Sequence, residues 1–497
     1  MGIFLGIDLG TQSVKVVALE ETGKLLASSG NDYPIDTPRT GFAEQDPETW
    51  WKQTVKSCQQ VLQSTGIREV DGIGFSGQMH GLVMLDENDS PVYPAIIWPD
   101  QRSYAEVEYI RSILGETLAD VCGSDIATGF MAASLLWVKK NLPDIFYRIR
   151  KVLLPKDYLK VKFGLEPSTD AADASGTLLF DIRKRTWSYE VLSVLGFDER
   201  IFPPVSESTD IIGCLSAKTK ESLGIRGKAE LVAGGADQTC SAVGNGILEK
   251  GELLITIGTG GQVVAPVDQP IVDPELRTHT FCHALPNTWY VLGATLCAGL
   301  SMNWFRTVVT GGSKDCLTFN TLGVEAAQVE AGSGGVLFLP YLIGERTPHK
   351  NPTARGSFLN LHLTHKRGHL ARSIMEGVAM AVKDSVEIIR SLGISPQHVL
   401  FAGGGAKSVL WRNILASFLQ LPVVTSGARE ETASGAAMLS MVATGHFSSF
   451  REAVQAVVNL DPPTLPKKEW IDIYEERYLL FQNAYKQVSP LFPQESG

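Results

Sequence analysis

Two short segments, one in each half of the chain, carry residue types that could bind a polyphosphate. Both are apolar runs that lead into a turn of glycine and threonine, at residues 3–9 and 253–257. Each pattern predicts a β-hairpin. Glycine lets backbone N–H groups approach an anion closely, and threonine adds a hydroxyl donor. We therefore expect two similar domains that hold the phosphates of ATP from opposite sides. The residues expected at these phosphates are Gly10, Thr11, Gln12, Lys15, Gly258 and Thr259.

Asp8 lies two residues before Gly10, at the end of the first apolar run. A carboxylate and a phosphate repel each other at close range, so Asp8 suggests a Mg²⁺ ion between them. Mg²⁺ is commonly bound through one or two carboxylates together with substrate phosphates. The alternative is a turn residue that accepts hydrogen bonds from local N–H groups. The glycine–threonine turns in both halves favour the metal site.

Asp237 follows the apolar segment 231–236, after Gly234 and Gly235. In α/β sheets the ligands bind at the carboxyl ends of the strands. Phosphoryl transfer to an alcohol needs a group that accepts the hydroxyl proton. Asp237 is the candidate for this base, although an aspartate after two glycines is by itself more often a turn former.

Two further segments contain candidate binding residues. The loop Gln78-Met79-His80-Gly81 follows the apolar run 70–76, and His80 could hydrogen-bond a hydroxylated substrate. The glycine run 403–405 lies between an expected strand at 399–402 and an expected helix at 409–419. It lacks the spacing of a P-loop, so from the residues alone a nucleotide contact and a plain tight turn are equally plausible.

The elements that must position these residues alternate between strands and helices, which predicts an α/β fold. Residues 47–62 and 370–389 have helical spacing of their apolar positions. Because 497 residues exceed the size of an ordinary single domain, we expect two, at residues 1–248 and 249–497.

Composition excludes several classes of partner and compartment. The net charge of −10 argues against nucleic acid and anionic membranes as partners. No apolar run is long enough for a membrane span, and the first expected strand begins at residue 3, which leaves no room for a signal peptide. Seven widely spaced cysteines without a C-x-x-C pair suggest reduced thiols, so we expect a cytoplasmic protein.

Taken together, the motifs resemble those of the FGGY carbohydrate kinases, over essentially the whole chain. The matching segments are the first hairpin, 356–377, 403–408 and 431–437. The resemblance implies an α/β fold with two actin-like, ribonuclease H-like domains and a nucleotide and sugar cleft between them. It implies that the sugar site is lined by Gln78, Met79, His80, Asp237 and Gln238, and that the adenosine side of ATP is contacted by Gly404, Gly405 and Asn413.

Within the family, residues 76–81, 154–159, 281–286 and 340–349 are similar to the xylulose kinase subfamily. The implied reaction is the ATP- and Mg²⁺-dependent phosphorylation of D-xylulose at its terminal hydroxyl, with Asp237 as base and Asp8 at the metal. The partners are then only a sugar and ATP, and a homodimer is a hypothesis that the sequence does not test.

Three residues depart from the pattern of that subfamily. Gln238 replaces the usual asparagine after Asp237, Pro99 replaces an asparagine after Trp98, and Gly260 replaces a serine in the second turn. The first two leave open a kinase for ribulose, gluconate or glycerol. A non-catalytic ATP switch of the actin or chaperone type is a further alternative, which the sugar-type loop at 78–81 and Asp237 weigh against.

Overall fold

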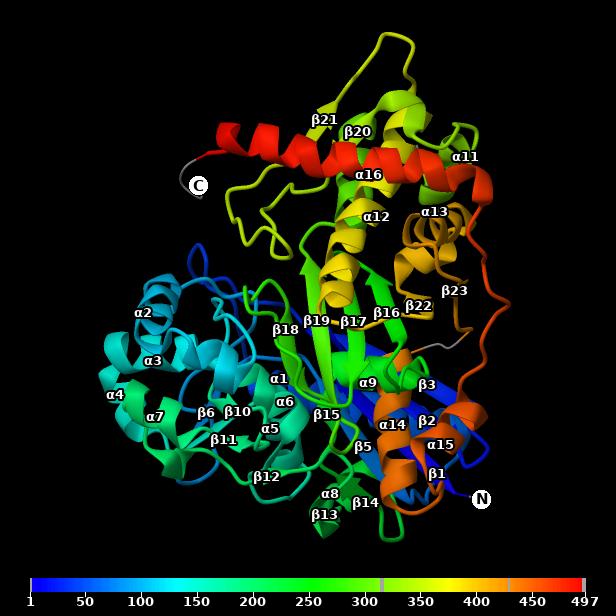
Figure 1. The fold of residues 1–497 in the computed structure, drawn as a ribbon. Helices are drawn as coiled ribbons and strands as arrows, with labels where there is room; N and C mark the ends of the chain where they lie inside the picture. The colour runs from blue at the N-terminus through cyan, green and yellow to red at the C-terminus, as the bar shows by residue number, and fades with distance from the viewer. Residues whose placement is uncertain (1, 313–316, 428–429, 494–497) are drawn as a thin grey trace.

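The computed structural model describes residues 2–312, 317–427 and 430–493, which build two large mixed sheets (Figure 1). The first sheet has the strand order β13-β14-β5-β1-β2-β3, with β15 also paired to β5. Its strands are β1 (Ile3–Leu9), β2 (Ser13–Glu20), β3 (Leu25–Asp32), β5 (Gly72–Gly77), β13 (Ile211–Cys214), β14 (Glu230–Val232) and β15 (Gly235–Ala236).

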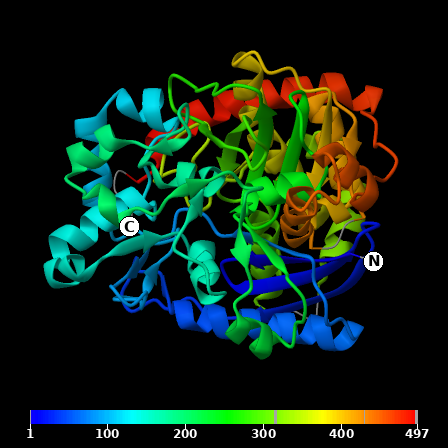
Figure 2. The same cartoon turned by 90° about the horizontal axis from the view of Figure 1, so that it is seen from below.

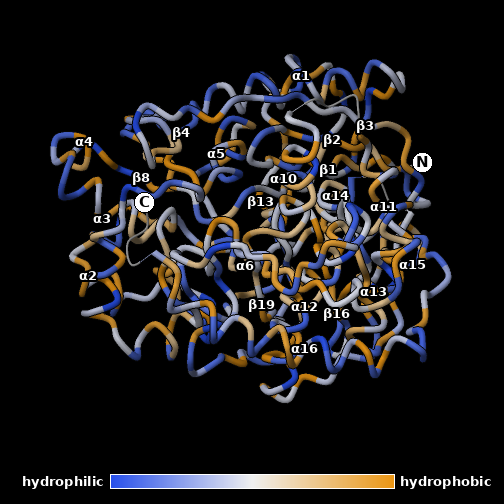
Figure 3. Tube along the Cα trace, turned by 90° about the horizontal axis from the view of Figure 1, so that it is seen from above, coloured by the Kyte–Doolittle hydropathy of each residue, from blue (hydrophilic) through white to orange (hydrophobic). Residues whose placement is uncertain are grey.

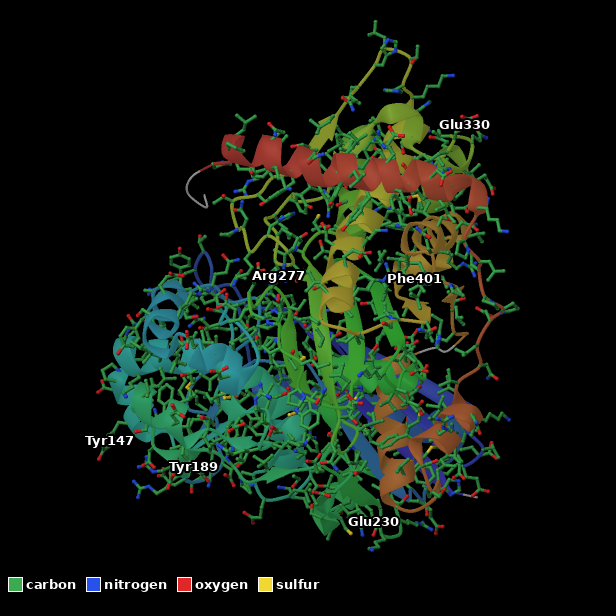
Figure 4. The ribbon with its side chains drawn as sticks, viewed as in Figure 1. Tyr147, Tyr189, Glu230, Arg277, Glu330 and Phe401 are labelled. Atoms are coloured by element: carbon green, nitrogen blue, oxygen red, sulfur yellow. The ribbon has the colours of Figure 1, made fainter. Side chains whose placement is uncertain are left out.

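The second sheet has the strand order β18-β19-β17-β16-β22-β23. Its strands are β16 (Glu252–Ile257), β17 (Gly261–Val267), β18 (His279–Cys282), β19 (Trp289–Thr295), β22 (His398–Ala402) and β23 (Val423–Val424). The labelled Phe401 lies on β22, inside this sheet (Figure 4).

The two sheets repeat one topology. In each, a hairpin is formed by two antiparallel strands, β1 with β2 and β16 with β17. The first strand of each hairpin also pairs in parallel with a strand from later in the chain, β5 or β22. β1 has side chains buried on both faces, as expected for a strand inside a covered sheet. The prediction of an α/β fold with two similar halves is confirmed.

The helices predicted from periodicity are present. α1 (Pro47–Thr65) begins after Asp46, whose carboxylate accepts a hydrogen bond from the Glu48 N–H, and α12 (Arg367–Ser391) covers 370–389. α13 (Val409–Leu419) has the predicted bounds. The remaining long helices are α2 (Tyr104–Leu114), α3 (Met131–Asn141), α9 (Asp237–Gly244), α10 (Gly299–Thr310), α11 (Phe319–Ala327), α14 (Glu431–Ala443), α15 (Phe450–Val457) and α16 (Lys468–Val488).

α14, which belongs to the last part of the sequence, packs on the sheet of the first half. It lies against the hairpin strands and beside α9, as the orange helix next to the blue strands in Figures 1 and 2. A Cβ added to Gly6 of β1 would lie 1.8 Å from the Ala433 carbonyl oxygen, and one added to Gly74 of β5 would lie 1.8 Å from that of Ala436. The backbones therefore touch without intervening side chains.

Apolar residues are concentrated inside the molecule, and hydrophilic stretches lie along much of its outline (Figure 3). A segment between β5 and β14, drawn in cyan in Figures 1 and 2, forms a separate lobe beside the two sheets. It contains α4 (Pro143–Arg148), α6 (Ala171–Ala174) and α7 (Tyr189–Leu195), besides α2 and α3, whereas α5 (Pro155–Lys162) packs on α1 and β5 of the first sheet. Among the described helices, none combines the length and the apolar character needed to cross a membrane.

Candidate active site

Asp8 and Asp237 lie at the same edge of the first sheet. β1, β5 and β15 are parallel neighbours, and Asp8 is in register with Ser76, which in turn is in register with Gly235. Asp237 follows β15 directly and begins α9. The carboxyl ends of three adjacent strands therefore bring together two carboxylates that are far apart in the sequence.

Both carboxylates are held in an environment that disfavours negative charge. Burial raises the pKa of Asp8 to about 6, against the opposing effect of the nearby Lys15 ammonium. Burial, and then the charge of Asp8, raise the pKa of Asp237 to about 7. One oxygen of each carboxylate, Oδ1, is buried and accepts no hydrogen bond from the described residues. Two adjacent orphaned acceptors of this kind fit a divalent cation.

The first glycine–threonine turn is fixed from several sides. The Gly10 N–H donates to the Ser13 carbonyl oxygen over 3.0 Å. The indole of Trp98 donates to the Thr11 hydroxyl over 2.9 Å, and the Gln45 amide donates to the Thr11 carbonyl oxygen over 2.7 Å. Gln12, at the tip, is exposed. The turn is thus held in place from several sides and partly open to solvent, next to Asp8.

The second turn is docked on the start of α10. The backbone N–H of Gly299 donates to the Gly258 carbonyl oxygen, and those of Ala298 and Leu300 donate to the Thr259 carbonyl oxygen, all at 2.9–3.0 Å. Gly258 and Thr259 are themselves exposed. The turn is held by α10 on one side and exposed to solvent on the other. It can therefore bind a ligand with little loss of conformational entropy.

The glycine run at 403–405 adjoins the second turn. Gly403 adopts φ +80°, and a Cβ there would lie 2.7 Å from the carbonyl oxygen of Ile257, the last residue of β16. Gly404 is exposed and Gly405 is buried. Asn413 lies further along, on α13, where its amide donates to the Val409 carbonyl oxygen over 2.9 Å. The glycines therefore border the second phosphate turn, as a nucleotide-binding loop would.

The predicted sugar residues follow β5 at the same edge as the carboxylates. Gln78 is buried, and its amide donates to Gln45 over 3.1 Å. Met79 is also buried, and the Tyr290 hydroxyl lies 3.8 Å from its sulfur. Gln238 is half-buried in the first turn of α9. The partly exposed members of the predicted sugar set are therefore His80, Asp237 and Gln238.

His80 has a strained backbone and a defined protonation state. Its φ is +72°, and its ring stacks on Phe130 with 3.9 Å between the centroids. Burial lowers the pKa of His80 to about 4, so the ring is neutral at pH 7. Nδ1 lies 2.6 Å from the Gly176 carbonyl oxygen, which can only accept, so Nδ1 carries the proton. Nε2 is left as an acceptor, which suits a sugar hydroxyl.

Residues 3–244 match the N-terminal domain of the FGGY family of carbohydrate kinases, and residues 253–444 match its C-terminal domain. The chain belongs to this family. It is 34% identical over 494 residues to a xylulose kinase of Bacillus subtilis, covering 99% of this chain and 98% of that one. It is 35% identical over 491 residues to a xylulose kinase of Escherichia coli, covering 98% and 100% of the two chains.

The fold of this FGGY kinase is also that of solved relatives. A crystal structure described as a xyloylose kinase of Brucella ovis superposes with a TM-score of 0.93 at 32% identity, over 98% of this chain and all of the other. These matches confirm the predicted family and the actin-like two-domain fold. The division at residue 248 and the roles of single site residues stay predictions.

The departure at Pro99 lies in a well-ordered structural motif of this FGGY kinase. The Arg102 guanidinium is buried and donates to Asp100 and Glu44, at 2.7 Å for each. The Asp100 carboxylate also accepts from the Ala43 N–H over 2.6 Å. The substitution of proline leaves this buried ion cluster intact, and Trp98 still reaches Thr11.

Sequence reasoning missed several residues at the site. Tyr33 donates to the Gly10 carbonyl oxygen over 2.5 Å, and Glu430 pairs with Lys15 over 2.7 Å. His279, from the second half, shares the Phe130 and Phe281 rings with His80, and the charge of Arg346 adds to burial in lowering the pKa of both histidines. The segment 340–349 is similar to a subfamily motif, yet its sequence does not single out Arg346.

Proposed function

We propose that this FGGY kinase transfers the γ-phosphoryl group of ATP to the terminal hydroxyl of D-xylulose. The observation that carries the proposal is the pair Asp8 and Asp237 at one sheet edge, beside a rigid phosphate-type turn. The full-length similarity to enzymes named xylulose kinase supports the choice of sugar. The segments similar to that subfamily, including 76–81, point the same way.

In this proposal each part of the site has one task. The turns at Gly10–Thr11 and Gly258–Thr259, with Gln12 and Lys15, hold the phosphates, while Gly404, Gly405 and Asn413 contact the adenosine. Asp8 would hold Mg²⁺, which supplies neutralisation of the phosphate charge when it is bound.

Asp237 accepts the proton of the sugar hydroxyl as its oxygen attacks the γ-phosphorus and ADP leaves. A carboxylate with a pKa near 7 is well matched to this task, because a base works best when its pKa is close to the working pH. Gln78, Met79, His80 and Gln238 shape the sugar site. The Nε2 atom of His80 accepts a hydrogen bond from a sugar hydroxyl, because the proton of the ring is on Nδ1.

Two domains, 1–248 and 249–497, would close around the substrates in this scheme. The two phosphate turns lie on different sheets, so both can bind the same ATP molecule only if the two domains move together. Closure also excludes water, which would otherwise hydrolyse ATP.

ADP release should be measured with ATP and Mg²⁺ alone and then with a sugar panel. We expect D-xylulose to give the highest kcat/KM among D-xylulose, D-ribulose, hexuloses, gluconate and glycerol. A tenfold preference for gluconate or glycerol would overturn the choice of substrate. It would show that the departure at Gln238 predicts the substrate better than the subfamily segments do. ADP release that no sugar increases would indicate an ATP switch in place of a sugar kinase.

A further inference from the structure

The segment 344–347 of the second half is fixed rigidly at the end of β19. The Glu345 carboxylate accepts hydrogen bonds from the Leu296 N–H over 3.0 Å, the Arg346 N–H over 2.7 Å and the Thr295 hydroxyl. Glu345 is therefore fully engaged by its own surroundings. The backbone that carries Arg346 is held in place on its N-terminal side.

Thr347 fixes the same backbone on the other side. Its N–H donates to the Ala294 carbonyl oxygen over 3.0 Å, and its hydroxyl donates to the Arg277 carbonyl oxygen over 2.7 Å. Arg277 is labelled in Figure 4, beside the boundary between the cyan lobe of the first half and the body of the second. Arg346 thus projects from a rigid anchor at this boundary.

The guanidinium of Arg346 has no hydrogen bond or ion pair with any described residue, although the side chain is only partly exposed. Asp125, whose charge acts on His279, is already used, because its two oxygens pair with Lys350 at 2.8 Å and Arg111 at 3.1 Å. Burial lowers the pKa of Arg346, against the opposing charge of Glu345. A half-buried, unpaired cation is costly unless a ligand supplies its acceptors.

The groups around Arg346 belong to the sugar end of the site. Its charge adds to burial in lowering the pKa of His80 to about 4 and that of His279 to about 3. The two imidazoles are joined by a wall of aromatic rings: His80 stacks on Phe130, His279 stacks on Phe281, and the His80 and Phe281 centroids are 6.0 Å apart. The residue after Arg346, Thr347, is bound to Ala294 of β19, and Leu292 of the same strand is in register with His279, so the backbone of this segment lies beside these rings.

Both histidines present acceptors and no charge. Nδ1 of His279 lies 2.5 Å from the Ser124 hydroxyl oxygen, and that hydroxyl donates to the Asp125 carbonyl oxygen over 3.0 Å. His279 Nδ1 therefore carries a proton, and Nε2 is an acceptor, as in His80. This end of the site combines two acceptors for hydroxyl groups with one forked cationic donor.

Resting on the function proposed above, we propose that Arg346 is a substrate-binding residue that donates to the C1 hydroxyl and C2 carbonyl oxygens of the ketose. These two oxygens lie on adjacent carbons, at the end remote from the hydroxyl that is phosphorylated. A guanidinium presents parallel N–H groups that match such a pair, which lysine cannot do. The second half of the chain thus takes part in choosing the sugar as well as in binding ATP.

The test combines a change in the enzyme with a change in the sugar. Arg346→Met and the control Arg355→Met are compared on D-xylulose and on 1-deoxy-D-xylulose, which lacks the C1 hydroxyl. Arg355 is on the same loop, but its guanidinium already donates to the Pro352 and Ala354 carbonyl oxygens. For Arg346→Met we expect kcat/KM for D-xylulose to fall about 10- to 100-fold, mainly through KM, with KM for ATP within twofold.

The decisive quantity is the preference for D-xylulose, which is the ratio of kcat/KM for D-xylulose to kcat/KM for 1-deoxy-D-xylulose. We expect a clear preference in the wild type and in Arg355→Met, and a ratio near one in Arg346→Met. A Met variant that keeps the wild-type preference, or keeps kcat/KM within twofold, would overturn the assignment. If Arg346→Met does not fold, Arg346→Lys carries the same test, because it keeps the charge but loses the fork. A wild type that is inactive on D-xylulose but active on another sugar would refute the proposed function instead.

Discussion

The Lys15 ammonium lies 2.7 Å from the Glu430 carboxylate, and this ion pair connects the first phosphate hairpin to the start of α14. Lys15 is on β2, directly opposite Asp8 in the register of the hairpin. Glu430 also contributes to raising the pKa of Asp8. Lys15, which is predicted to bind phosphate, is therefore already paired with an acidic residue from the other half of the chain.

Releasing Lys15 should strengthen ATP binding. In Glu430→Gln the ammonium is free and a negative charge near the phosphates is removed, so KM for ATP should fall by up to about fivefold, which is the range of one exposed ion pair. Lys15→Met should raise KM for ATP. Initial-rate kinetics at saturating sugar measure both values. An unchanged KM in both variants would show that Lys15 does not reach the nucleotide.

Asp237→Asn should remove the proton acceptor while keeping the shape of the side chain. We expect kcat for sugar phosphorylation to fall at least about 10²-fold, the usual contribution of a general base. ATP binding, followed by titration with a non-hydrolysable analogue, should stay within a few-fold. A variant that keeps more than a tenth of the wild-type kcat would exclude Asp237 as the base, and loss of ATP binding would indicate a metal-binding role.

The contact between α9 and α14 should not tolerate a methyl group. A Cβ on Gly435 would lie 1.9 Å from the Cys240 carbonyl oxygen, and one on Gly244 would lie 1.9 Å from that of Glu431. Gly435→Ala should therefore reduce the free energy of unfolding by about 3 kcal/mol or more, as overpacking against backbone does.

Gly323→Ala is the matched control for this substitution. Gly323 also lies inside a helix, α11, but an added Cβ meets nothing within 4 Å. Alanine should stabilise the protein there by about 0.5–1 kcal/mol, because glycine is the poorer helix former. Urea denaturation compares the two variants, and a neutral Gly435→Ala would contradict the close packing of α9 on α14.

His349 should make the folded state sensitive to acid. Its ring stacks on Tyr485 and lies 3.1 Å from the Tyr341 hydroxyl, and burial lowers its pKa from 6.5 to about 4. Between these values the unfolded chain is protonated at His349 and the folded chain is not. Acidification therefore favours unfolding, and this contribution to stability is lost as the pH falls from 6.5 to 4.

In His349→Phe this loss is absent. The free energy of unfolding of the variant, relative to the wild type, should be about 2 kcal/mol higher at pH 4.5 than at pH 7.5. The loss of the hydrogen bond to Tyr341 lowers the stability of the variant at both pH values and therefore cancels in this comparison. Urea denaturation at the two pH values measures the difference. A pH-independent difference would show that folding does not lower the pKa of His349.

The local elements and the chemistry of the short motifs could be predicted from sequence patterns alone. Apolar runs before glycine–threonine turns specified the two hairpins, and the spacing of apolar residues specified α1, α12 and α13. Asp8 and Asp237 could be chosen because each follows an apolar strand, where an α/β sheet places its ligand groups.

Which distant residues share the site could not be predicted and follows from the packing of whole elements. α14 packs on the first sheet because glycines at positions 6 and 74 leave room for its backbone, and no local pattern reveals that fit. The same long-range packing brings Glu430 to Lys15 and His279 to the aromatic rings around His80. The reason is physical: periodicity records which face of an element is buried, whereas the partner of a charged side chain depends on how whole elements dock.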